Sequence, residues 1–112
     1  MTVFGTYLRE LRKAKGYSQS QLAARIGTSK TLISRFETED NFPPSEKTAL
    51  ALAEALDANP DVVLVMAGKV SSSLIEILQK RPDVLTQLLR DIEHLPDHAL
   101  LRISRVVKDG KW

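Results

Sequence analysis

The 112-residue sequence contains no cysteine and no long apolar run. The absence of cysteine excludes disulfides and thiolate metal sites. The longest apolar run, Val62–Ala67, is far too short to cross a bilayer, and no apolar signal segment precedes the basic residues near the N-terminus. These absences predict a cytoplasmic protein that does not bind membranes.

The residue patterns of catalytic and metal sites are also missing. The chain has no glycine-rich phosphate loop and no plausible nucleophile–base pair. His94 and His98 are four residues apart, but Pro96 lies between them and is expected to begin a new helix, so the two imidazoles would not share a helix face. We therefore expect no enzyme activity, no cofactor and no metal site.

Charge is distributed unevenly along the chain, although the net charge is only +2. Residues 1–35 contain seven basic residues and one acidic residue, a net charge of +6. Residues 36–69 contain two basic and seven acidic residues, a net charge of −5. Such segregation can present a positive face to phosphates, and the plain alternative is solvated surface charge.

Apolar residues recur at helical spacing, and no segment alternates convincingly with a period of two. A first helix is expected over residues 3–15, and Gly16 would end it. The next four helices each begin after a residue suited to an N-cap: Ser18, Thr28 or Ser29, Ser45 and Asn59. The core side of the helix after Ser45 is expected to contain four residues: Leu50, Leu52, Ala53 and Leu56. Three further helices follow at about residues 72–80, 82–94 and 96–108, which makes the protein all-α.

Residues 18–37 have the pattern of two short helices joined by a tight turn. Gly27 permits the turn, and the small Ala23 permits the two helices to approach closely. The latter of these two helices, which is the third helix of the chain, then buries Ile33 and Phe36. It presents hydrogen-bonding side chains outward: Ser29, Lys30, Thr31, Ser34 and Arg35. A DNA major groove admits one α-helix, so this outward set is suited to reading base edges.

Further residues fall at a spacing typical of one family: Tyr7 to Gln19, Leu22-Ala23, Gly27 to Ser29, Ile33-Ser34 and Glu37. With these residues the chain resembles the phage-repressor type of helix-turn-helix, the Cro/C1 or XRE family. The resemblance extends through Leu50, Ala53 and Leu56 and covers about residues 4–68. It implies a five-helix lambda-repressor-like DNA-binding domain, here followed by about three C-terminal helices.

The resemblance also implies roles for individual residues. Phosphate contacts would come from the start of the second helix, here Ser18 and Gln19, and Arg12 and Glu37 would form a structural ion pair. Base contacts would come from the third helix: Ser29, Lys30, Thr31, Ser34 and Arg35. The chemistry agrees, because arginine and lysine can donate to guanine O6 and N7 and threonine can offer its methyl group to thymine. The alternative is that Lys30 and Arg35 are merely solvated.

The loop after the third helix departs from the family pattern. Relatives often have basic residues or a glycine there that meet the phosphates, whereas this loop is Thr38-Glu39-Asp40-Asn41. Phosphates would repel Glu39 and Asp40. We therefore expect this loop either to turn away from DNA or to help reject wrong sites.

The remaining residues lie beyond a domain that is already complete in the family, so we divide the chain into residues 1–69 and 70–112. We expect the second segment to form a homodimer through apolar residues at helical spacing: Leu88, Ile92, Leu100, Ile103 and Val107. The leading hypothesis is a repressor that reads a palindromic operator in double-stranded DNA as a homodimer. The alternatives are an antitoxin or adaptor whose C-terminal helices bind a protein partner (a toxin or an antirepressor), a restriction–modification controller, or C-terminal helices that fold back on the first domain.

Overall fold

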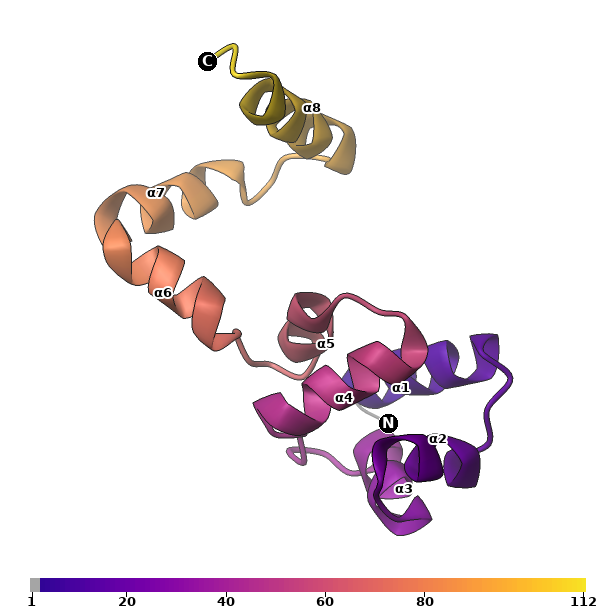
Figure 1. Cartoon of the computed structure of the whole chain (residues 1–112). Coiled ribbons are helices and arrows are strands. Elements are labelled where there is room, and N and C mark those ends of the chain that lie inside the picture. The colour runs from indigo at the N-terminus through magenta and orange to yellow at the C-terminus, as the bar shows by residue number, and fades with distance from the viewer. Residues whose placement is uncertain (1–2) are drawn as a thin grey trace. The chain divides into compact units, whose positions relative to one another are not determined.

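The computed structural model describes residues 3–112, which contain eight helices and no strand (Figure 1). The chain divides into two compact units, Met1–Leu74 and Ile75–Trp112. The first contains α1 (Val3–Ala14), α2 (Gln19–Ile26), α3 (Lys30–Thr38), α4 (Glu46–Leu56), α5 (Pro60–Met66) and the start of α6 (Ser72–Lys80); α7 (Pro82–Ile92) and α8 (Asp97–Asp109) lie in the second. The expected all-α, lambda-repressor-like architecture is thus confirmed.

Side-chain caps begin most helices of the first unit. The hydroxyls of Ser18, Ser29 and Ser45 each accept a hydrogen bond from a backbone amide three residues later, and Asn59 Oδ1 accepts from the amides of Asp61 and Val62. Each cap satisfies one of the amides that a helix start leaves without a partner. The helix boundaries predicted from these residues therefore agree with the structure.

A single core joins the five helices of the first unit. α2 packs against α3 and α4, and α1 packs against α3 and α5. The buried apolar side chains come from all five of the helices α1 to α5: Phe4, Leu8, Leu22, Ala23, Ile33, Phe36, Ala49, Leu52, Ala53, Leu56, Val63 and Leu64. The prediction for Leu50 is wrong, because this side chain is 47% exposed. Ala49 takes its place, since Ala49, Leu52, Ala53 and Leu56 follow the i, i+3, i+4, i+7 spacing of one helix face.

The first unit extends past the expected boundary at Lys69 and ends within α6. Ser71 is buried, and its hydroxyl accepts a hydrogen bond from the amide of Leu74. The amide and the hydroxyl of Ser72 both donate to the Glu46 carboxylate, at 3.1 and 2.6 Å. These hydrogen bonds lower the pKa of Glu46 from its ordinary value. The serine run is therefore a structured connection to α4.

The second unit differs from the first in having no core of its own. None of the residues 75–112 is buried, although α7 and α8 are amphipathic. Large apolar side chains are instead exposed along these helices, including Val84, Leu88, Leu89, Leu101, Ile103 and Val107. None of the helices in the described part of the chain is long and apolar enough to span a bilayer.

Candidate nucleic-acid interface

Hydrogen bonds fix both ends of α2, the helix before the turn that leads into α3. At the start of α2, Ser18 Oγ accepts from the Gln21 amide at 3.0 Å, and Gln21 Oε1 accepts from the Ser18 amide at 2.8 Å. At the other end, Gly27 adopts a left-handed conformation with φ +72°, and the Thr28 amide donates to the Ala23 carbonyl at 2.9 Å. A residue with a side chain is strained at this φ, which explains the glycine.

The outer face of α3 contains the five residues expected to meet bases. Lys30 and Thr31 are exposed at the first turn of the helix, and Ser34 is half-buried one turn later. Ser29 is also exposed, but as the N-cap its hydroxyl accepts a hydrogen bond from the Leu32 amide at 3.2 Å. The structure thus brings the predicted residues together on one face, with the Ser29 oxygen already engaged in holding the helix.

Arg35, the fifth of these residues, has two partners within the protein. Its Nε donates to Glu39 Oε1 at 3.0 Å, and its guanidinium lies 3.8 Å from the centroid of the Phe42 ring. Glu39 belongs to the loop Thr38-Glu39-Asp40-Asn41 that the sequence analysis judged unfavourable for DNA, and Phe42 directly follows that loop. Neither was predicted to contact Arg35. The Arg35–Glu39 spacing of four residues was a signal for this pair, since side chains four apart meet on a helix.

A buried ion pair between Arg12 and Glu37 joins α1 to α3. Arg12 Nε donates to Glu37 Oε2 at 2.7 Å, and Arg12 Nη2 donates to Glu37 Oε1 at 3.0 Å. Arg12 Nη1 donates to the Tyr17 carbonyl at 2.8 Å, so the same guanidinium also holds the connection between α1 and α2. The hydrogen bond to Glu37 raises the pKa of Arg12. A buried pair of charges needs such additional partners, because desolvation otherwise outweighs their attraction.

Gln19 connects this ion pair to the surface. It is half-buried at the first position of α2, and its Nε2 donates to Glu37 Oε1 at 3.3 Å. Ser18, the other residue expected to meet phosphate, is exposed, and its side chain is used as the cap. The Arg12–Glu37–Gln19 network therefore fixes the start of α2 relative to the end of α3.

Gly5 is a further residue that the sequence analysis did not single out. A Cβ atom at this position would lie 2.1 Å from the Glu37 carbonyl oxygen, so α1 passes α3 closely enough to require glycine. The contact lies beside the ion pair, because Glu37 is the residue approached. A glycine in the interior of an amphipathic helix carries no sequence signal that distinguishes a close contact from a weak helix position.

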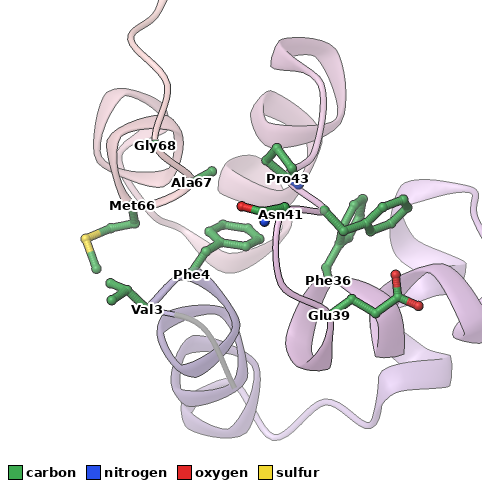
Figure 2. Close-up of a pocket in the computed structure, with 10 residues that line it drawn as sticks. Val3, Phe4, Phe36, Glu39, Asn41, Pro43, Met66, Ala67 and Gly68 are labelled. Atoms are coloured by element: carbon green, nitrogen blue, oxygen red, sulfur yellow. The ribbon is translucent and has the colours of Figure 1, made fainter.

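An apolar hollow of about 270 Å³ lies beside the α3–α4 loop (Figure 2). Its walls come from the start of α1, from α3, from the loop and from the end of α5, and they include Phe4, Phe36, Phe42 and Met66. Glu39 and Asn41 are its lining residues with polar side chains. No group of three or more histidine and carboxylate residues in residues 3–112 is arranged to hold a metal ion.

Comparisons with known proteins agree with this geometry. A helix-turn-helix family model matches residues 8–63. The chain is 31% identical over 109 residues to the uncharacterized HTH-type transcriptional regulator RghRB of Bacillus subtilis (strain 168), an alignment that covers 86% of this chain and 74% of the relative. It is 32% identical over 81 residues to a second such regulator of that organism, YobD, with 69% of this chain and 71% of the relative covered.

A solved structure gives the same fold. The similar chain belongs to a complex of SinR protein and SinI protein, with a TM-score of 0.53 and 24% identity, and the alignment covers 90% of this chain and 98% of that chain. At this identity the likeness shows the fold alone. The assignment of this chain to a family therefore rests on the match to the helix-turn-helix family model and on the similarity to the two regulators.

Proposed function

This chain belongs to the XRE, or Cro/C1-type, family of helix-turn-helix DNA-binding transcriptional regulators, and from that premise we propose that it is a repressor that reads a palindromic operator as a homodimer. α3 would enter the major groove, with Lys30, Thr31 and Arg35 reaching base edges. Ser29 and Ser34 would lie beside them, and Ser18 and Gln19 would meet the phosphates that flank the groove.

One observation supports the proposed recognition: α3 has a polar outer face, and its opposite face is buried in the first unit. Lys30, Thr31 and Arg35 are exposed, whereas Ile33, Phe36 and Glu37 of the same helix are buried. A reading helix needs this combination, because base edges are distinguished by donors and acceptors held in register with the groove. In this arrangement Arg12 and Glu37 have a supporting role and do not contact DNA.

The homodimer is supported by the exposed apolar residues of the second unit. Of the five side chains expected to pair, Leu88 is 47% exposed, Ile103 42% and Val107 61%, and Ile92 and Leu100 are half-buried. Exposed apolar side chains in such number indicate a contact surface that needs an occupant. A second copy fits best, because two groove-reading helices related by a two-fold axis match two half-sites of a palindrome.

Selection of bound sequences from a random DNA pool tests the proposed recognition. We expect the wild-type chain to select a palindromic consensus, and Arg35→Ala to reduce discrimination at one base pair of each half-site by about 5- to 150-fold, the equivalent of one lost bidentate contact. Arg9→Ala removes the same charge from the exposed side of α1 and should leave the base preference unchanged. Salt-sensitive binding by the wild type without any sequence preference would contradict the proposal.

A protein partner is the second candidate function, and the same exposed apolar surface favours it. In this case α7 and α8 would bind a different protein, such as a toxin or an antirepressor, in place of a second copy. The two candidates differ in the oligomeric state of the purified chain. A monomer at micromolar concentration would favour the partner.

A further inference from the structure

Arg35 is held in place before any ligand arrives. Glu39 accepts a hydrogen bond from Arg35 Nε at 3.0 Å, and Phe42 supports the guanidinium at 3.8 Å from its ring centroid. Nearly half of each charged side chain remains exposed, at 45% for Arg35 and 46% for Glu39. The guanidinium is thus fixed on one edge and on one face, and the rest of it remains accessible.

The support from Phe42 extends into the core. The Phe42 ring lies 5.4 Å from the Phe36 ring at an interplanar angle of 31°, and Phe36 meets Phe4 edge-on at 6.5 Å. Phe4 and Phe36 are both buried. The loop reaches this position through Asn41, which adopts the left-handed conformation with φ +54°. The surface under Arg35 is therefore packed against the core of the first unit.

We propose that Glu39 and Phe42 are positioning residues that orient Arg35 toward guanine. This inference rests on the proposed function. Guanine O6 and N7 accept from two donors of one guanidinium, and Glu39 occupies Nε, which leaves the Nη1 and Nη2 groups without any other hydrogen-bond partner among the described residues. A guanidinium restricted in this way loses less rotational freedom on binding, so affinity and base discrimination both increase.

The positioning role gives a reason for an acidic residue beside a DNA-reading helix. A carboxylate near phosphates weakens binding to any DNA. Glu39 offsets this loss of affinity only if it improves the contact of Arg35 with the correct base. Its hydrogen bond to Arg35 Nε can do so by orienting the guanidinium. Asp40 lies next to it, is exposed, and makes no ion pair in the described structure, so it contributes charge alone.

This difference between neighbouring acids supplies the experiment. Glu39→Ala and Asp40→Ala each remove one negative charge, and both should tighten binding to non-specific DNA by a similar factor. Only Glu39→Ala should also reduce discrimination at the base pair read by Arg35, by about fivefold to tenfold. Glu39→Gln keeps an oxygen acceptor and should retain part of the discrimination, and Phe42→Leu should lose it while leaving an apolar side chain against Phe36.

A measurement on the free protein separates the failure of this inference from failure of the proposed function. Exchange of the Arg35 Nε–H with water, followed by NMR, should be slowed in the wild type and in Asp40→Ala and accelerated in Glu39→Ala, with thermal melting confirming that each variant is folded. If Arg35→Ala loses guanine discrimination but Glu39→Ala retains it, the positioning role is wrong and the proposed function stands. A gain of guanine discrimination in Glu39→Ala would show that Glu39 withholds Arg35 and would also overturn the inference. If the wild type selects no sequence, both are wrong.

Discussion

Gly5 is a residue at which the fold tolerates little change, because an added Cβ would overlap the backbone of Glu37. It lies within α1 and is buried where this helix passes the end of α3. The atom that a Cβ would meet belongs to the backbone of Glu37, which cannot move aside without shifting α3, the helix that we propose reads the bases. The spacing of α1 and α3 therefore depends on the absence of a side chain at one position.

Gly5→Ala should lower the free energy of unfolding, although alanine is the better helix former by about 1 kcal/mol. We expect a net loss of about 1–3 kcal/mol, because relieving the overlap requires α1 and α3 to separate. Chemical denaturation measures this loss. Thr6→Ala, on the exposed side of the same helix, should change stability by less than about 0.5 kcal/mol. Equal or greater stability of Gly5→Ala would show that α1 adjusts freely.

At the scale of the helix, local chemistry made most boundaries predictable. Ser18, Ser29, Ser45 and Asn59 cap the helices that were expected to follow them. These signals are readable because a cap involves residues only two or three positions apart. The wrong assignment of Leu50 arose because α4 has apolar residues on more than one face, and only its packing partners decide which face is buried.

The partners of Arg35 were less predictable. Its bond to Glu39 lies within one helical turn, but the contact with Phe42 depends on the path of the loop through Asn41. The outward residues of α3 could be named from periodicity and from the family resemblance. The way in which Arg35 is held in the folded protein could not be predicted, because it depends on the packing of Phe42 against Phe36.

An ion pair between Lys15 and Asp57 connects the end of α1 to the end of α4. Its hydrogen bond lowers the pKa of Asp57 and raises that of Lys15. Because the folded-state pKa of Asp57 is depressed, the pair stabilises the fold at a pH above the unfolded pKa of about 3.9. This stability is lost as the pH falls through the lower folded-state value.

Asp57→Asn should therefore lower the Tm at pH 7 and have no effect at a pH below the folded-state pKa of Asp57. Asparagine also tolerates the left-handed conformation of Asp57, which has φ +53°, so the substitution tests the charge alone. The difference should shrink in high salt, because both groups are exposed to solvent. Asp40→Asn is the matched control: it also removes one exposed carboxylate, Asp40 makes no ion pair among the described residues, and the Tm at pH 7 should change little. A Tm difference that persists in acid would contradict the assignment to the ion pair.

Of the two units of the molecule, only the first has a hydrophobic core among the described residues. The first buries apolar side chains from each of five helices. The second has amphipathic helices and no buried residue from Ile75 to Trp112. Periodicity made the helices of the second unit predictable, because it identifies the apolar face of a helix. It does not indicate what covers that face. Burial of that face against a second copy would give these helices the core that they lack.

Replacing two exposed apolar residues tests this dimer in the full-length chain. We expect the wild type to sediment as a dimer at micromolar concentration, and Leu88→Gln with Val107→Gln to shift it toward monomer, since both side chains are exposed in the second unit. Glutamine adds no charge, so electrostatic attraction to DNA is unchanged. The variant should then bind a full palindrome hardly better than a half-site. Val65→Gln removes an equally exposed side chain from the first unit and should leave the dimer intact. A monomeric wild type, or a double variant that stays dimeric, would show that Leu88 and Val107 do not form a dimer interface.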